Sequence, residues 1–182
     1  MMSKKILNNL YQAVVKAKND IRDIEGSNFL RGNLGTEAHF LWRTMYNFEY
    51  TLPAGYIQSP EVKPLGKGEK TKSYDFGVYH NSVPVIIAEF KMSTTLTSHV
   101  KSEYPKLIKV MNHLTKNDIN RPFIGLIFYL EKKEKTVLDG LLAKKYCPTL
   151  YAKNHSFSDN YFEFLVHEET DKAIVYPKNL FS

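Results

Sequence analysis

The twenty residues SYDFGVYHNSVPVIIAEFKM, numbered 73–92, set three charged side chains among residues that otherwise belong inside a protein. Asp75 lies near the start of this stretch, and Glu89 and Lys91 interrupt an apolar run near its end. Two neighbouring carboxylates offer the oxygen ligands that Mg²⁺ or Mn²⁺ takes. A lysine beside them can orient or help to deprotonate an attacking water, or offset charge on a phosphate. Together these residue types predict metal-assisted hydrolysis of a phosphodiester.

The three charges must come from adjoining strands if they are to act together. The run VPVIIAEFKM reads as a strand, and its alternation places Glu89 and Lys91 on one face. The run SYDFGVY reads as its hairpin partner through a tight turn at HNS. A two-residue turn sets Asp75 opposite Ala88, whereas a turn one residue longer sets it opposite Glu89. Both registers bring Asp75 close to Glu89, but they place its side chain on different faces.

A structural interpretation competes with the catalytic one. Glu89 and Lys91 can form a salt bridge at the edge of a sheet, and Asp75 can cap a strand. The face that Asp75 takes is the feature that separates the two interpretations, because a metal site needs all three side chains on one side.

The rest of the sequence predicts the elements that position this hairpin. Apolar residues recur at three- and four-residue steps from Ile6 to Ile24 and within residues 36–50, which indicates two amphipathic helices. Residues 53–72 read as a loop with at most a short strand at GYIQS. The later pattern predicts a helix from about residue 98 or 105, a strand over 122–133, a short helix over 135–146, and final strands over 161–169 and 172–177 joined across the TD dipeptide. This order predicts an α/β fold in which helices flank a mixed central β-sheet.

Composition indicates a single domain and points weakly to a polyanionic partner. The chain has 182 residues, 43 % of them hydrophobic, which is enough for one sizeable core over residues 1–182. Its formal charge of +6 and pI near 9.2 suit nucleic acid. Cys147 is the only cysteine, which excludes an intramolecular disulfide and a cysteine-based zinc site. The sequence shows no signal peptide and no membrane-spanning run, so we expect a cytoplasmic protein that does not associate with membranes.

The hairpin and its charges resemble the PD-(D/E)xK nuclease superfamily, the fold of restriction endonucleases and of many repair and recombination nucleases. In that superfamily an acid on one strand is followed by E-x-K or D-x-K on the next. Here those positions are Asp75 and then Glu89, Phe90 and Lys91. The shared core is a helix, three strands, a helix and a strand, an order that the sequence predicts from about residue 34 to 130. The chain departs from the family pattern at Tyr74, which replaces the proline before the acid.

The resemblance implies a restriction-endonuclease-like core and a role for each residue of the motif. Asp75 and Glu89 would bind Mg²⁺, for which Mn²⁺ substitutes in such sites, and Lys91 would position or activate the water. Many members add a glutamate ligand from the helix before the strands, and Glu37 is the best match here. The competing residues for that role are His39 and Glu49.

The activity implied by the resemblance is Mg²⁺-dependent endonucleolytic hydrolysis of DNA, with restriction of foreign DNA as the leading role. The chain leaves little room for a separate recognition domain, so cutting both strands calls for a homodimer or a partner subunit that supplies specificity. Basic side chains near the site are candidates for phosphate contacts: Lys67, Lys70, Lys72, Lys101 and Lys106. The alternatives are repair or junction resolution, RNA cleavage on the same core, and a non-catalytic nucleic-acid-binding module.

Overall fold

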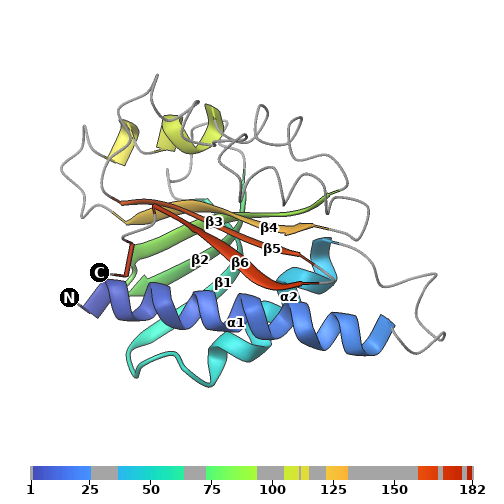
Figure 1. Ribbon diagram of the computed structural model, residues 1–182. Helices are drawn as coiled ribbons and strands as arrows, with labels where there is room; N and C mark the ends of the chain where they lie inside the picture. The colour runs from blue at the N-terminus through green and yellow to red at the C-terminus, as the bar shows by residue number, and fades with distance from the viewer. Residues whose placement is uncertain are drawn as a thin grey trace.

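The computed structural model of the chain describes residues 2–25, 37–63, 73–93, 105–110, 112–114, 122–130, 160–167, 170–177 and 180–181. Helices and strands follow one another through these ranges (Figure 1). They are α1 (Met2–Glu25), α2 (Glu37–Glu49), β1 (Tyr56–Val62), β2 (Tyr74–His80), β3 (Val83–Ser93), β4 (Phe123–Leu130), β5 (Tyr161–His167) and β6 (Thr170–Tyr176). Residues 105–110 and 112–114 are also helical. None of the described helices is long and apolar enough to cross a membrane.

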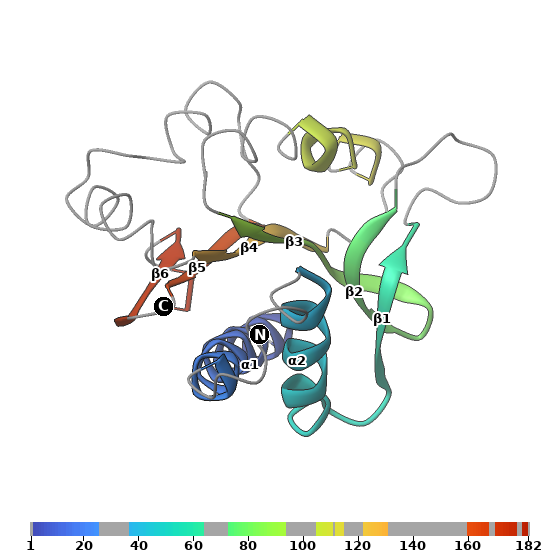
Figure 2. The same cartoon turned by 90° about the vertical axis from the view of Figure 1, so that its right-hand side faces the viewer.

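The six strands form one mixed sheet in the order β1-β2-β3-β4-β5-β6. Strands β1, β2 and β3 make an antiparallel meander, β3, β4 and β5 run parallel, and β6 is antiparallel to β5. A parallel pair needs a crossover connection, and the helical residues 105–110 and 112–114 lie in the crossover from β3 to β4. Helices α1 and α2 cover one face of the sheet, and the helical residues 105–110 and 112–114 lie on the other (Figure 2). The predicted α/β fold with helices flanking a mixed sheet is therefore confirmed.

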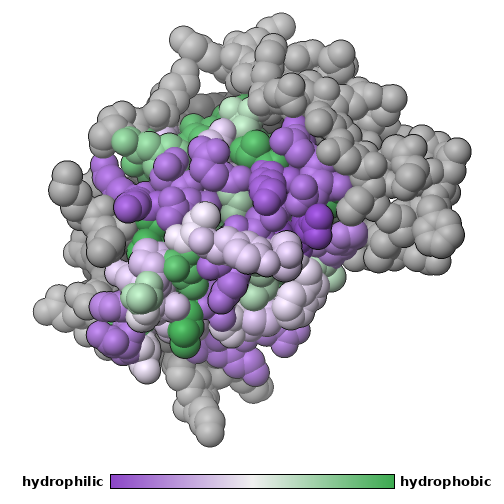
Figure 3. Space-filling view, turned by 90° about the horizontal axis from the view of Figure 1, so that it is seen from below, coloured by the Kyte–Doolittle hydropathy of each residue, from purple (hydrophilic) through white to green (hydrophobic). Residues whose placement is uncertain are grey.

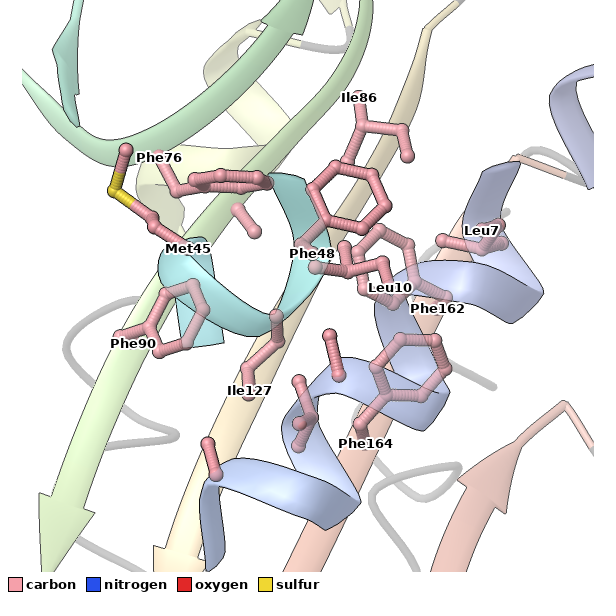
Figure 4. Packing of buried hydrophobic residues seen from close by; sticks show 14 of the residues in the cluster. Leu7, Leu10, Met45, Phe48, Phe76, Ile86, Phe90, Ile127, Phe162 and Phe164 are labelled. Atoms are coloured by element: carbon pink, nitrogen blue, oxygen red, sulfur yellow. The ribbon is translucent and has the colours of Figure 1, made fainter. Parts of the chain in front are cut away.

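The larger core lies between the sheet and the layer of α1 and α2 (Figure 4). The apolar stripe predicted for the first helix is buried there: Ile6, Leu10, Ala13, Val14, Ala17 and Ile21. Aromatic rings join the layers, since Phe40 of α2 packs edge-on against Phe90 of β3 and Tyr129 of β4, at centroid distances of 5.5 and 5.2 Å. Burial of this apolar area is the main source of stability, and it fixes α2 against the strands.

The outer surface of the helical layer is mostly hydrophilic or intermediate, with a few hydrophobic residues among them (Figure 3). The large apolar or aromatic side chains that stay exposed on α2 and the adjoining residues are Trp42, Tyr46 and Tyr50. This distribution is the one that an amphipathic helix produces when only one side is packed.

A second core fills the opposite face of the sheet. Leu107, Val110 and Leu114 are buried there, as the helical spacing of the sequence predicts. They share this core with Leu126 and Phe128 of β4, whereas Ile127 and Tyr129 of the same strand belong to the other core. Strand β4 is apolar throughout because both of its faces are covered.

The hairpin between β2 and β3 combines features of the two registers that the sequence allows. The turn has two residues, Asn81 and Ser82, with φ of 50° and 66°, the left-handed pair that a tight hairpin turn requires. Beyond the turn the register shifts by one residue, so that Val78 pairs with Ile86 and Val85 is the extra residue of a β-bulge. Val85 accordingly packs against the core on the α1–α2 side.

The bulge determines where Asp75 lies. Phe76 pairs with Ala88 and Gly77 with Ile87, so continuing this register brings Asp75 level with Glu89. A two-residue turn without a bulge would have set Asp75 opposite Ala88 and on the other face. The structure therefore has the register that suits a common site. It combines a two-residue turn with a bulge, whereas the sequence predicted that this register would need a turn one residue longer.

Two predicted boundaries were wrong, and one predicted element lies outside the described residues. Strand β1 extends to Val62 and includes Pro60, whereas the sequence predicted at most a short strand at GYIQS. Proline is tolerated there because β1 is an edge strand that pairs only with β2. Strand β6 begins at Thr170, which pairs with His167, so the hairpin does not turn across the TD dipeptide. The short helix predicted over residues 135–146 is the element outside the described ranges.

Candidate active site

The predicted catalytic residues come from three elements that meet at one end of the sheet. Asp75 is the second residue of β2, Glu89 and Lys91 lie near the end of β3, and Glu37 is the first residue of α2. An antiparallel hairpin places the start of β2 beside the end of β3. Packing of Phe40 on Phe90 brings the first turn of α2 to the same place. The geometry of these four side chains therefore depends on the two cores described above.

Lys91 links the three elements. Its Nζ donates a hydrogen bond of 2.7 Å to Glu37 Oε1, forms an ion pair of 3.5 Å with Asp75 Oδ2, and donates 2.7 Å to the Phe90 carbonyl oxygen. Burial by itself lowers the pKa of Lys91, but the hydrogen bond to Glu37 and the negative charges of Asp75, Glu37 and Glu89 outweigh it and raise that pKa above its ordinary value. Lys91 is consequently a protonated cation at neutral pH, suited to offsetting negative charge.

The Asp75 side chain accepts a backbone hydrogen bond at the point where the regular pairing of β2 and β3 ends. The last residues paired between β2 and β3 are Phe76 and Ala88. Beyond them Asp75 Oδ2 accepts a hydrogen bond of 2.9 Å from the Phe90 N–H. The carboxylate thereby occupies the place of a strand carbonyl, and 31 % of its side chain stays exposed. This bond orients Asp75 toward β3 and leaves part of it open to a ligand.

Glu89 is much more deeply buried than its companions and has a cation from the opposite layer. Its side chain is 3 % exposed, and Lys106 Nζ lies 3.9 Å from its Oε1. Lys106 belongs to the helical residues 105–110, and its carbonyl oxygen accepts a hydrogen bond of 3.1 Å from the Tyr74 hydroxyl. Although Glu89 and Lys91 start from the same face of β3, Lys91 thus pairs with Glu37 of α2 and Asp75 of β2, whereas Glu89 pairs with Lys106 from the layer on the opposite face of the sheet.

The carboxylates of Glu37, Asp75 and Glu89 are oxygen ligands of the kind that Mg²⁺ binds, but in this structure each of them lies next to a lysine. Among the described residues, no three side chains of His, Cys, Asp and Glu come close enough together to form a metal site. Glu37 and Asp75 converge on the Lys91 ammonium, while Glu89 is next to Lys106. Two carboxylates that converge on one cation fit a Mg²⁺ site in donor chemistry, and the cation between them in this structure is the lysine.

The other predicted residues divide into those the structure describes and those it does not. Of the three candidates on α2, Glu37 is bonded to Lys91, whereas Glu49 lies at the far end of the helix, about 18 Å away along its axis. Glu49 accepts a hydrogen bond from Gln58 of β1. Of the lysines predicted to contact phosphates, Lys106 adjoins the site. The remainder lie outside the described residues: Lys67, Lys70, Lys72 and Lys101.

Two features near the site were missed by the sequence reasoning. Tyr74 was noted for the proline it replaces, and its bond to the Lys106 backbone depends on a tertiary contact that no local pattern signals. Glu163 was not singled out, although YFEFLVH interrupts an apolar strand with an acid just as IIAEFKM does. Glu163 is fully buried, its Oε1 accepts a hydrogen bond from the Tyr161 hydroxyl, and burial raises its pKa to about 7.

No protein-family model, no curated protein and no solved structure matches this chain. The chemistry of the site therefore has to be inferred from its own residues, their contacts and the topology that positions them.

Proposed function

We propose that this chain is a Mg²⁺-dependent endodeoxyribonuclease built on a restriction-endonuclease-like core. The observation that carries the proposal is the convergence of Glu37 and Asp75, from two different elements, on the ammonium of Lys91. These are three of the four residues expected from the PD-(D/E)xK resemblance. Glu37 and Lys91 are 54 positions apart in sequence and have no local reason to meet in this way, and the buried Glu89 lies two residues from the lysine that Glu37 and Asp75 share.

The topology supports the same proposal. Helix α2 is followed by the meander β1–β2–β3, by the helical residues 105–110 and 112–114, and by β4 parallel to β3. That is the order of helix, three strands, helix and strand expected for the superfamily. Helix α1 and strands β5 and β6 extend this core, which is consistent with one nuclease domain across the chain.

Glu37 and Asp75, which converge on the Lys91 ammonium, are the residues that would hold the metal ion. Glu89 would be a third ligand once its side chain moved toward them, because the three carboxylates do not form one cluster in this structure. When bound, Mg²⁺ supplies Lewis acidity toward the phosphate and activates the attacking water. The Phe90 N–H keeps the Asp75 carboxylate oriented at no further cost in reorganisation. Lys91, protonated because of its acidic neighbours, offsets charge that develops on the phosphate.

DNA is the polyanion that we assign as substrate, and the net charge of +6 favours its approach. A single site of this kind cuts one strand at a time, so cleavage of both strands requires a homodimer or a partner subunit that also supplies sequence specificity. Restriction of foreign DNA in the cytoplasm is the cellular role that we propose.

Supercoiled plasmid DNA and single-stranded RNA, each incubated with Mg²⁺, Mn²⁺ or EDTA, provide the test. We expect the wild-type chain to cut DNA with either metal and not with EDTA. Lys91→Ala and Asp75→Asn should each lose at least about a hundredfold in rate, since each removes a charge from the reacting centre. Lys5→Ala and Glu49→Gln are matched controls, because they remove exposed charges distant from Lys91, and both should cut at the wild-type rate.

Equal rates for the wild type, Lys91→Ala and Asp75→Asn would refute a catalytic role for the site. Cutting of RNA alone would replace DNA as the substrate. Binding of DNA without any cleavage in Mg²⁺ or Mn²⁺ would favour the non-catalytic nucleic-acid-binding module instead.

A further inference from the structure

Each carboxylate assigned to the metal already lies within ion-pair distance of a lysine of the chain. Lys91 Nζ is 2.7 Å from Glu37 Oε1 and 3.5 Å from Asp75 Oδ2. Lys106 Nζ is 3.9 Å from Glu89 Oε1. The two ammonium groups therefore compensate three carboxylates that would otherwise repel one another.

Lys106 is fixed in this position by contacts of its backbone and of the next residue. The Tyr74 hydroxyl donates to the Lys106 carbonyl oxygen at 3.1 Å, and Tyr74 directly precedes Asp75 on β2. Leu107 is completely buried in the core on this face of the sheet. The Lys106 side chain itself is 24 % exposed, so it extends from a rigid support toward Glu89 while keeping access to solvent.

We propose that Lys106 is a positioning residue whose ammonium competes with the divalent cation for Glu89. This inference rests on the proposed nuclease function and assigns to Lys106 a role beyond contact with DNA phosphates. Glu89 is buried, and a carboxylate bound to Mg²⁺ at about 2.0–2.1 Å cannot keep a second cation equally close without repulsion between the two cations. The metal must therefore displace the Lys106 ammonium, and the cost of that displacement weakens metal binding.

The competition predicts that removing the ammonium tightens metal binding. Titration of the full-length chain with Mn²⁺ alone, followed by the electron paramagnetic resonance of the free ion, measures the affinity without any cleavage. We expect Lys106→Ala to lower the Kd for Mn²⁺ by about twofold to fivefold, as for loss of a partly exposed ion pair. Lys106→Arg, which keeps the positive charge, should retain the wild-type affinity.

Lys109→Ala is the matched control, because Lys109 is exposed on the same helical segment and should leave the Mn²⁺ affinity unchanged. Lys106→Gln provides a second neutral variant that keeps most of the side-chain length and packing. Circular dichroism of every variant establishes that the fold is retained.

The two proposals fail in different ways. If the wild type cuts plasmid DNA but Lys106→Ala and Lys106→Gln bind Mn²⁺ no more tightly than Lys109→Ala, the role of Lys106 is overturned and the nuclease proposal stands. If the wild type neither binds Mn²⁺ nor cuts DNA, both proposals are overturned.

Discussion

Glu89 and Glu163 lie level with each other across the sheet, yet their surroundings differ. Glu89 of β3 pairs with Leu126 of β4, which pairs in turn with Glu163 of β5. Paired residues share a face, so the two carboxyl groups start from the same face, two strand spacings or roughly 10 Å apart. Both residues are buried, with exposures of 2 % and 0 %. Because the two positions are so similar in backbone geometry and burial, a difference between their carboxyl groups reflects the side chains around them.

The neighbours of Glu89 are charged, and the described neighbour of Glu163 is not. Lys106 Nζ is 3.9 Å from Glu89, and the negative charge of Glu89 contributes to raising the pKa of Lys91. Glu163 accepts a hydrogen bond from the Tyr161 hydroxyl, while its Oε2 has no hydrogen-bond partner in the part of the chain that the structure describes.

The pKa of Glu163 shows what burial does where none of the residues that the structure describes pairs a cation with the carboxyl group. Burial raises this pKa from 4.5 to about 7, and the Tyr161 bond lowers it only in part. Two glutamates of one sheet therefore differ in their electrostatic surroundings. Glu89 is part of a charged cluster, whereas Glu163 has a pKa raised to about 7. The difference comes from the elements packed over each strand, because the sheet itself treats the two positions alike.

The largest expected effect comes from removing each charge in turn and measuring cleavage. If the proposed function is right, Glu89→Gln should lower the rate of plasmid cleavage by at least about a hundredfold, because a neutral amide is a poor metal ligand. Glu163→Gln should cut within about twofold of the wild type, since the reaction does not use this side chain. Equal losses of cleavage rate in the two variants would show that Glu89 has no catalytic role that Glu163 lacks.

The next effect concerns stability, and its sign follows from the pKa of Glu163. Between pH 4.5 and about 7 the unfolded chain has released the Glu163 proton while the folded chain keeps it, so stability falls as the pH rises through this window. The gap in pKa corresponds to about 3 kcal/mol. Glu163→Gln keeps an acceptor for Tyr161 without the charge, and should be the more stable protein above pH 7.

Thermal unfolding of the wild type and Glu163→Gln at pH 5 and pH 9 measures this difference. We expect similar Tm values at pH 5 and a Tm higher by about 5–10 °C for the variant at pH 9, as about 3 kcal/mol gives for a chain of this length. An advantage for the variant that is the same at both pH values would show that Glu163 does not titrate in this range.

The smallest expected effect is that of the hydroxyl beside Glu163. Tyr161→Phe removes a hydrogen bond that lowers the pKa of Glu163, so that pKa should rise further. The lost bond should also cost about 0.5–1.5 kcal/mol of stability. Infrared titration of the buried carboxyl and urea unfolding measure the two effects. Tyr50→Phe, which removes a hydroxyl from an exposed tyrosine, is the matched control, and a similar response from it would exclude a specific role for Tyr161.

The sequence allowed most of the elements to be predicted, because their periodicity is strong. The stripe that begins at Ile6 predicted α1, and the apolar run FIGLIFYL predicted a strand covered on both faces. The extent of β1 could not be predicted, since Pro60 is tolerated only at a sheet edge and edge position is a property of the assembled sheet.

The candidate site was predictable as a set of residues and not as a geometry. The sequence by itself determined which side chains stand at the ends of β2 and β3, because alternation and turn chemistry are local. Only the tertiary structure decided that a bulge at Val85 brings Asp75 level with Glu89, and that Glu37 and Lys106 reach the strands from opposite layers. The physical reason is that a one-residue register shift and the packing of helices on a sheet are set by contacts between residues distant in the chain.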